Sequence, residues 1–395
     1  MFYEYFISFV VAFIVAFSAT PIAKRLAFKM GAVDIPKDNR RMHKKPIARL
    51  GGLAIVSGFF IALLFNMTGS LFDIGGVFDP DRKQLSGILI GIVIIVALGI
   101  IDDIKPLSAK IKLVFQLLAA FIVVLTGTTI QNITNPFSDL GVSTLSPYVS
   151  YPITILWIVG ITNAVNLIDG LDGLAAGVSS ISSLSLFFVS VIVGDPNTAV
   201  ITAALAGSAL GFLPYNFNPA KIFMGDTGAT FLGFTLGVIS IQGMLKSFAA
   251  ISLAIPLLVL GLPLFDTAFA ILRRLLKGRS IMEADRGHLH HRLIDMGLSH
   301  KQSVVVMYIA SAALGLCAIV LADKGVLGAI VLFISVSVFI VGGARYMSEI
   351  SDNDDDTGPD EGAEEKNVPG ESNDQVNSDT KENKDEKKTP DAVTG

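Results

Sequence analysis

Long apolar runs and short polar connections alternate over the first 345 residues of the chain. A membrane-spanning helix needs roughly 20 apolar residues, so these runs predict eleven helical spans, with ends placed to within a few residues. The fold class predicted from this pattern is an all-α polytopic membrane protein. The runs lie at about 2–20, 51–67, 85–101, 111–127, 151–166, 174–193, 198–214, 227–243, 248–270, 303–321 and 325–343.

The composition supports this fold class. Hydrophobic residues make up 52% of the chain and charged residues 16%, and the mean hydropathy is +0.63. These values exclude a soluble globular protein of 395 residues. The single cysteine, Cys317, excludes an intrachain disulfide and a cysteine metal cluster.

The two ends of the chain differ in character. Glu4 stands where a signal peptide carries basic residues, and the positive charges follow the first run, so we expect a retained first helix. Residues 349–395 carry 16 acids and 5 bases, whereas the chain upstream carries 18 acids and 25 bases. The C-terminal segment cannot bury enough apolar surface to fold alone. We predict a membrane domain at 1–345 and a disordered tail at 346–395.

Lys and Arg are distributed unevenly between alternate connections. One set of connections holds 20 of them, mostly in residues 21–50 and 271–302, and the other set holds 4. Because cytoplasmic loops carry the excess of Lys and Arg, the first set is predicted to be cytoplasmic. The N-terminus would then lie outside the cell membrane and the tail inside.

Four polar stretches fall on this predicted cytoplasmic side. Helices that start there direct their N–H groups and the positive end of the helix dipole at any bound anion. The pattern indicates one carboxylate-rich, anion-binding surface at the inner leaflet. The four stretches are Asp102–Asp103, Asn166–Asp172, Asn216–Asp226 and His288–His291.

The stretch Asn166–Leu174 places two carboxylates between apolar runs, where charge is costly and usually functional. Asp169 and Asp172 stand three residues apart, and the glycines beside them allow a tight turn and a close approach to a ligand. A hard cation that carries phosphates suits such a pair. The alternative is that Asp172 only caps the helix that follows it.

Asp102 and Asp103 close the third apolar run at a helix C-terminus, where the helix dipole disfavours acids. Their position favours Mg²⁺ ligation and positioning of a phosphate nucleophile over a merely solvated helix end. Lys105, Lys110 and Lys112 supply positive charge nearby, although lysines beside the inner leaflet are also ordinary topology signals.

Residues 214–228 form the second dense polar stretch. Asp226 precedes the eighth run and is either a metal ligand or only a helix N-cap. Asn216 and Asn218 offer amides suited to a base or a metal-bound oxygen, and Phe223 could stack on a nucleobase. Mg²⁺ takes about one or two carboxylates together with substrate phosphates, so the remaining acids must position or activate other groups.

Three histidines, His288, His290 and His291, follow Arg286 in the third stretch. Zinc is disfavoured because no cysteine and no matched carboxylate set completes a tetrahedral site. The histidines are better suited to donate to a diphosphate or a sugar, and Arg286 can make forked contacts to phosphate. Arg49 adds positive charge in the first connection, which by itself is only a positive-inside loop.

These motifs together resemble those of the polyprenyl-phosphate N-acetylhexosamine-1-phosphate transferases. Within that family the chain is most similar to the bacterial TagO-type enzymes, which prime wall teichoic acid synthesis on undecaprenyl phosphate. The resemblance covers residues 1–345 and leaves out the tail. The motifs that carry it are Asp102–Asp103, Asn163–Gly173, Phe223–Asp226 and His288–His291, which are specific as a set.

The resemblance implies a reaction and its partners. The chain would transfer GlcNAc-1-phosphate from UDP-GlcNAc to undecaprenyl phosphate with Mg²⁺ or Mn²⁺ as cofactor, giving undecaprenyl-diphospho-GlcNAc and UMP. The expected partners are these two substrates and membrane lipid, without nucleic acid, and a homodimer stays open.

The resemblance also implies roles for individual residues. Asp226 is assigned to the metal, and Asp102 and Asp103 are assigned to the metal or to the acceptor. Of these two, Asp103 is the one expected to bind the metal together with Asp226. Asn166 and Asp169 belong to the catalytic cleft together with His290. The residues assigned to substrate binding are Asp172 and Phe223, at the uridine, and Asn216, Lys112, Arg49, His288, His291 and Arg286.

Several alternatives stay open. Related transferases for phospho-muramoyl-pentapeptide carry three consecutive histidines where this chain has Leu289 after His288, which favours GlcNAc but leaves closely related hexosamines open. Direct attack and an aspartyl-phosphate intermediate are both compatible with the sequence, and so are teichoic acid, capsule or another glycan as the pathway. The alternative from another class is a transporter of anions or nucleotide sugars, since many spans with internal acids also suit transport.

Overall fold

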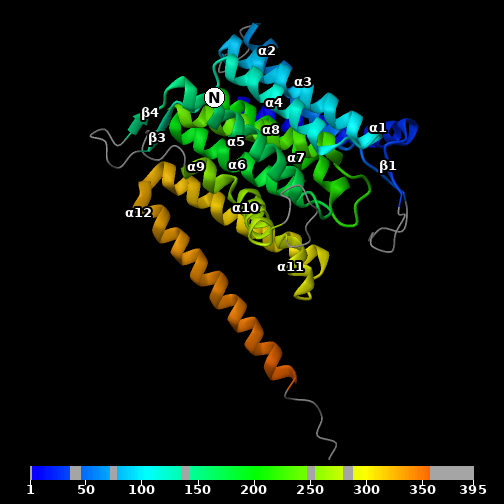
Figure 1. Cartoon of the computed structure of the whole chain (residues 1–395), viewed down its shortest axis with the longest axis vertical. Coiled ribbons are helices and arrows are strands. Elements are labelled where there is room, and N and C mark those ends of the chain that lie inside the picture. Colours follow the sequence, from blue (N-terminus) through cyan, green and yellow to red (C-terminus); the bar gives the residue numbers. More distant parts are fainter. Residues whose placement is uncertain are drawn as a thin grey trace, which may run out of the picture. The chain divides into compact units, whose positions relative to one another are not determined.

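The computed structural model describes residues 2–35, 46–71, 78–134, 142–246, 254–278 and 288–355. In these residues the chain is helical apart from two short hairpins (Figure 1), so the predicted all-α class is confirmed. The helices are α1 (Phe2–Met30), α2 (Gly52–Leu71), α3 (Arg82–Ile104), α4 (Ala109–Leu125), α5 (Pro147–Ile168), α6 (Leu174–Val193), α7 (Pro196–Asn216), α8 (Gly225–Lys246), α9 (Ala254–Val259), α10 (Gly261–Leu276), α11 (Leu289–Asp295) and α12 (His300–Asp355).

The two hairpins were not predicted from the apolar pattern, because each strand has only two or three residues. β1 (Val33–Asp34) pairs antiparallel with β2 (Ile47–Ala48). β3 (Asn132–Thr134) pairs antiparallel with β4 (Val142–Thr144).

Six of the described helices are long and apolar enough to cross a membrane. They are α1, α3, α5, α6, α7 and the part of α12 at His300–Gly328, and α2 adds a shorter apolar stretch at Gly52–Thr68. These helices identify a membrane protein. The predicted number of eleven spans stays a prediction.

The ninth apolar run, predicted as one helix over 248–270, is divided between α9 and α10 where the structure describes it. Pro263 explains the division. A proline inside a helix clashes with the carbonyl group four residues earlier, and here that residue is Val259, the last residue of α9. The tenth and eleventh runs join in α12, where Gly325 has a φ of +77° and interrupts the helix as the run boundary predicted.

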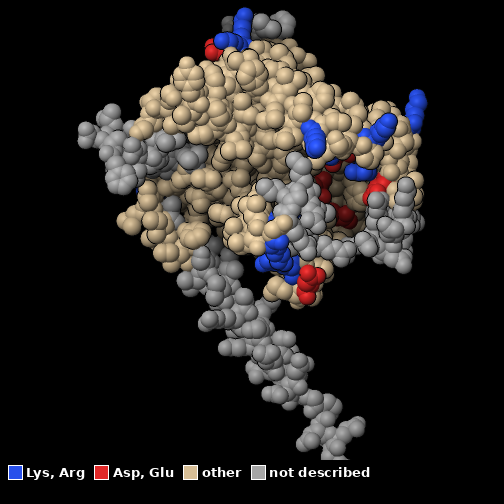
Figure 2. All heavy atoms as spheres, in the orientation of Figure 1, with Lys and Arg blue, Asp and Glu red and all other residues tan. Residues whose placement is uncertain are grey.

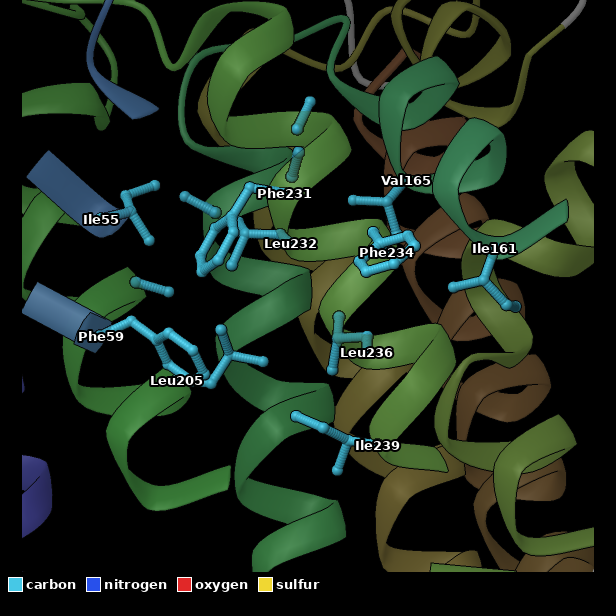
Figure 3. Close-up of a cluster of buried hydrophobic side chains, with 14 of the residues drawn as sticks. Ile55, Phe59, Ile161, Val165, Leu205, Phe231, Leu232, Phe234, Leu236 and Ile239 are labelled. Carbon is cyan, nitrogen blue, oxygen red and sulfur yellow. The ribbon is translucent and has the colours of Figure 1, made fainter. Parts of the chain in front are cut away.

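Helix α8 forms the centre of the bundle. It contacts α2, α3, α5, α6, α7 and α9, and its residues from Thr227 to Ile241 are buried on every side. A helix that is apolar around its whole circumference belongs in a core. Figure 3 shows Phe231, Leu232, Phe234, Leu236 and Ile239 of α8 among Ile55 and Phe59 of α2, Ile161 and Val165 of α5, and Leu205 of α7.

The chain divides into two compact units, Met1–Ile340 and Val341–Gly395. The second unit is described only as far as Asp355, where α12 ends. Helix α12 therefore includes the first residues of the predicted tail at 346–395. The rest of that tail lies outside the described residues, and its disorder stays a prediction.

Candidate active site

The first turn of α8 is held by a carboxylate from another helix. Asp103, near the end of α3, accepts hydrogen bonds from the N–H groups of Asp226 at 2.9 Å and Thr227 at 3.0 Å, and from the Thr227 hydroxyl at 2.6 Å. The first N–H groups of a helix have no partner within it, so Asp103 acts as an N-cap supplied from a distant part of the chain. Asp103 thereby fixes the position of Asp226.

Gly225 allows this close approach. Its φ is +71°, and a Cβ atom built on it would lie 2.5 Å from Asp103 Oδ2 and would also collide with the carbonyl oxygen of Arg49. Any other residue at this position would be strained. The Arg49 side chain places its Nε 3.9 Å from Asp103 Oδ1, so a positive charge accompanies the buried carboxylate.

Lys112 joins two of the predicted acids. Its Nζ lies 2.7 Å from Asp102 Oδ2 and also forms an ion pair with Asp226 Oδ2. Asp102 has a second partner, because its Oδ1 accepts the N–H of Leu107 at 2.7 Å. Two carboxylates and one ammonium group from α3, α4 and α8 therefore meet at the N-terminus of the central helix.

The connection before α2 lies against the segment that leads into α8. The Phe223 N–H donates to the Ala48 carbonyl at 2.8 Å, and the Gly51 N–H donates to the Phe223 carbonyl at 3.0 Å. Arg49 stands between these two contacts. The backbone pairing thus brings the segment that carries Arg49 against the segment that carries the half-buried Phe223.

Asp172 and Asn216 connect the loop after α5 to the residues after α7. Asp172 Oδ2 accepts hydrogen bonds from Asn218 Nδ2 and from the Ala220 N–H, both at 3.0 Å. Asn216 Oδ1 accepts the N–H of Gly173 at 3.1 Å. The N-cap residue of α6 is Gly173, so the described bonds of Asp172 are those of a link between two loops rather than of a simple helix cap.

Asp169 follows the last residue of α5, one turn after Asn166. Burial, together with the negative charges of Asp226 and Asp103, raises the pKa of Asp169 to about 7 against the opposing charge of Arg49. Asp169 therefore belongs to the same electrostatic group as the acids at the start of α8.

The histidines reach this group through Gly170. A Cβ atom built on Gly170 would lie 2.5 Å from His290 Nε2, so the imidazole ring packs directly on the Asp169–Asp172 loop. His290 lies between the rings of His288 and His291, with centroid distances of 5.8 Å and 4.2 Å. Burial and, to a smaller degree, the neighbouring His291 lower the pKa of His290 to about 4, which keeps His290 neutral near pH 7.

The structure brings most of the predicted residues together in unit Met1–Ile340. Arg286 lies outside the described residues, so its position is not assigned. The two adjacent acids of α3 have different partners in the structure. Asp102 shares a cation with Asp226, whereas the oxygens of Asp103 accept hydrogen bonds from the first turn of α8.

Three contributors were not recognised in the sequence: Thr227, Tyr308 and Asp266. Thr227 donates to Asp103, and the Tyr308 hydroxyl donates to the Gly173 carbonyl at 2.6 Å. Asp266 binds His288 through a 2.9 Å contact between Oδ2 and Nδ1. A signal for Asp266 did exist, because an acid inside an apolar run is usually functional.

The acids lie in a depression of the surface. Figure 2 shows Asp and Glu side chains recessed in a hollow, with Lys and Arg side chains along its edge. Elsewhere the described surface in this view carries few charged groups. A recessed group of acids with cations at the rim is suited to bind anions together with a cation.

The residues present fit a magnesium ion. Within the described part of the chain no group of three or more His, Cys, Asp or Glu side chains forms a metal cage. Mg²⁺ does not require one, because it is typically held by about one or two carboxylates and by substrate phosphates. Asp102 and Asp226, whose oxygens already converge on one ammonium group, are the pair that suits this mode of binding.

Comparison with known proteins gives a consistent result. Residues 85–244 match a family described as glycosyl transferase family 4. The chain is 43% identical over 319 residues to a protein of Bacillus subtilis (strain 168), named a probable undecaprenyl-phosphate N-acetylglucosaminyl 1-phosphate transferase, and the match covers 80% of this chain and 84% of that relative.

More distant relatives carry similar names. A decaprenyl-phosphate N-acetylglucosaminephosphotransferase of Mycolicibacterium smegmatis is 35% identical, with 80% of this chain and 82% of the relative covered. An undecaprenyl-phosphate alpha-N-acetylglucosaminyl 1-phosphate transferase of Salmonella typhi is 29% identical, with 74% of this chain and 77% of the relative covered.

Proposed function

The chain belongs to glycosyl transferase family 4, among the polyprenyl-phosphate N-acetylglucosaminyl 1-phosphate transferases, and on this basis we propose the reaction that it catalyses. The donor is UDP-GlcNAc, the acceptor is undecaprenyl phosphate, and the products are undecaprenyl-diphospho-GlcNAc and UMP. The observation that carries the proposal is the meeting of Asp102, Asp226 and Lys112 at the N-terminus of α8, where Asp226 also interacts electrostatically with Asp169.

In the proposed mechanism a phosphate oxygen of the lipid attacks the β-phosphorus of the nucleotide sugar. The bond between the β-phosphorus and the bridging oxygen breaks, and UMP leaves with the electron pair. A phosphomonoester has a second pKa near about 6, so most of the acceptor is ionised at neutral pH and direct attack needs no strong base. Direct attack is therefore favoured over an aspartyl-phosphate intermediate.

Catalysis then rests on positioning and on neutralising charge. Lys112 and Arg49 place positive charge beside the acids, and the positive end of the α8 dipole lies at the same place and favours bound phosphate. Mg²⁺, held by Asp102 and Asp226, would supply Lewis-acid stabilisation of phosphate charge. Asp103 has a supporting role in this mechanism, because it holds the turn that carries Asp226.

The donor would lie along the segment between α7 and α8. Asp172 holds this segment through Asn218 and Ala220, and Phe223 offers an aromatic face for uracil stacking. The active site and the tail face the cytoplasm in this proposal, because the Lys- and Arg-rich connections lie at that end. Priming of wall teichoic acid is the proposed role in the cell envelope.

A labelling experiment tests the proposal. Purified protein with Mg²⁺, UDP-[³H]GlcNAc and undecaprenyl phosphate should give chloroform-soluble label and an equal amount of UMP. The matched control omits undecaprenyl phosphate and should give neither product. Failure of the folded, purified protein to form labelled lipid would contradict the proposal. Competition with UDP-GalNAc would measure the preference for the hexosamine.

A further inference from the structure

A buried carboxylate that was not among the predicted site residues, Asp266, binds the start of the segment His288–His291. Asp266 of α10 places Oδ2 at 2.9 Å from His288 Nδ1, and its Oδ1 accepts the Leu289 N–H at 2.7 Å. The side chains of Asp266 and His288 are only 5% and 7% exposed. One carboxylate therefore fixes both the ring of His288 and the first backbone N–H group of α11.

The bond to Leu289 has the chemistry of a helix cap. His288 occupies the N-cap position of α11, yet its side chain makes no capping hydrogen bond. The N–H groups of a first helical turn need an outside acceptor, and Asp266 supplies it. The His288 ring is thus directed toward Asp266 instead of serving its own helix.

The bond to His288 sets the tautomer of the ring. An ionised carboxylate only accepts hydrogen bonds, so the Nδ1 atom of His288 carries the proton that lies between it and Asp266. This pairing fixes the orientation of the ring about its own axis. His288 is therefore held by a directional contact.

His290 is held differently, by packing. The rings of His288 and His290 are nearly parallel, with 9° between their planes. The ring of His290 also packs against Gly170. The Nδ1 atom of His290 has no hydrogen-bond partner among the described residues. The orientation of His290 consequently depends on the two rings beside it, and Asp266 holds one of them, the ring of His288.

We propose that Asp266 is a positioning residue, which acts through His288 to hold His290 against the Asp169–Asp172 loop. The inference rests on the proposed function, because that loop belongs to the proposed active site. It adds α10 to the elements that build the site. It also assigns distinct duties to the histidines, since His288 is an anchor and His290 is the ring that packs on the Asp169–Asp172 loop.

The test combines a chemical probe with kinetics. Diethyl pyrocarbonate modifies neutral imidazole rings that it can reach, and mass spectrometry of peptides gives the rate at each histidine. In the folded protein, His288 and His290 should react slowly, because both residues are buried. Asp266→Ala should accelerate the reaction at both rings, because His288 loses the hydrogen bond that orients it and His290 loses the fixed ring beside it.

Kinetics should show that Asp266 and His288 act as one unit. Asp266→Ala and His288→Ala should each lower kcat for lipid labelling by about 10–100-fold with little change in the KM for UDP-GlcNAc. The double variant should be no slower than the slower single variant, because coupled residues are not additive. Asp266→Glu should recover part of the rate, which a general packing defect would not allow.

Controls separate this inference from folding and from the proposed function. Asp323→Asn alters an exposed acid paired with Lys324 and should leave kcat within about twofold of wild type. If Asp266→Ala fails to fold, Asp266→Asn replaces it in the same measurements, because asparagine keeps the size of the side chain. Additive losses in the double variant, or an unchanged modification rate at His290, would overturn the inference. Absence of lipid labelling by the unmodified protein would instead overturn the proposed function, and the modification rates would still test the role of Asp266.

Discussion

Acids stand at both ends of the helical bundle, but they bind their partners over different distances along the chain. At the end where α3 and α7 begin, Asp81 accepts the N–H groups of Lys83 and Gln84, at 2.7 Å and 3.2 Å. Asp195 accepts the hydroxyl of Thr198 at 2.6 Å. These hydrogen-bond partners lie two or three residues away, in the helix that each acid precedes.

At the end where α3 finishes and α8 begins, the acids reach across the chain. Asp103 binds residues more than 120 positions away, and Asp172 binds residues more than 40 positions away. A local cap stabilises one helix, whereas a distant one fixes two elements relative to each other. Aspartate residues therefore support single helices at one end of the bundle and hold separate elements together at the other.

The largest effect should come from Asp226→Asn. The change removes a negative charge from the pair that shares Lys112, and loss of one preorganised electrostatic partner typically costs about 10²–10³ in rate. We expect lipid labelling to fall by about 10³-fold at any Mg²⁺ concentration. Initial rates measured over a range of Mg²⁺ concentrations provide the check.

The matched control for this variant is Asp81→Asn at the opposite end of α3. Asparagine is as good an N-cap as aspartate, so the rate should stay within about twofold of wild type. A near-normal rate for Asp226→Asn would remove this residue from the catalytic group. Equal losses in both variants would show that acids at the two ends do not differ in function.

Asp103→Asn should have the next largest effect. An amide can accept one of the N–H groups of the α8 turn, but its own NH₂ group would face the other donors. An unsatisfied buried donor costs about 1–3 kcal/mol, so both the midpoint of thermal unfolding in detergent and the labelling rate should fall. A loss of rate of about 10²-fold with an unchanged unfolding midpoint would point to a direct catalytic role instead of positioning.

The sequence could predict the helices and the meeting of the motifs, because both follow from apolar periodicity and from the alternation of helix ends. It could not assign the separate duties of Asp102 and Asp103. Adjacent residues on a helix point about 100° apart, and which of them faces α8 depends on the rotation of α3 in the bundle. That rotation is decided by packing, for example where Gly99 admits the backbone of Thr227.

Asp266 was missed for a related reason. It lies within the ninth apolar run, and its partner His288 follows after more than 20 residues. Only the fold of α10 against α11 shows that the acid and the ring meet. The division of that run could have been predicted, because Pro263 stands within it and proline interrupts a helix.

The pH dependence of the reaction should report on Asp169, which lies at the end of the bundle that carries the site. The pKa of Asp169 is raised to about 7 by burial and by the nearby acids, so its carboxylate is ionised above that pH and protonated below it. If the ionised form is active, kcat should fall by about tenfold per pH unit below about 7. The acceptor phosphate, with a pKa near about 6, would produce a fall only at lower pH.

Asp169→Asn tests this assignment, because asparagine keeps the shape of the side chain but cannot titrate. Its residual activity should lose the change near pH 7 and retain the one near the pKa of the acceptor phosphate. Titration of His290 should not change the rate between about pH 6 and about pH 8, because its pKa is lowered to about 4. An identical profile for Asp169→Asn and the unmodified protein would contradict the role of Asp169.

The smallest effect should come from Asp81→Ala, which removes a cap that binds only its own helix. Loss of such an N-cap costs about 1 kcal/mol, so the unfolding midpoint should fall slightly, while the labelling rate well below that midpoint should not change. Asp81→Asn should restore the midpoint. Since α3 carries Asp81 at one end and Asp102 with Asp103 at the other, a loss of rate in Asp81→Ala would mean that the whole helix shifts when its start is weakened. Unchanged activity would mean that the contacts of Asp103 with α8 hold the site end of α3 independently of its opposite end.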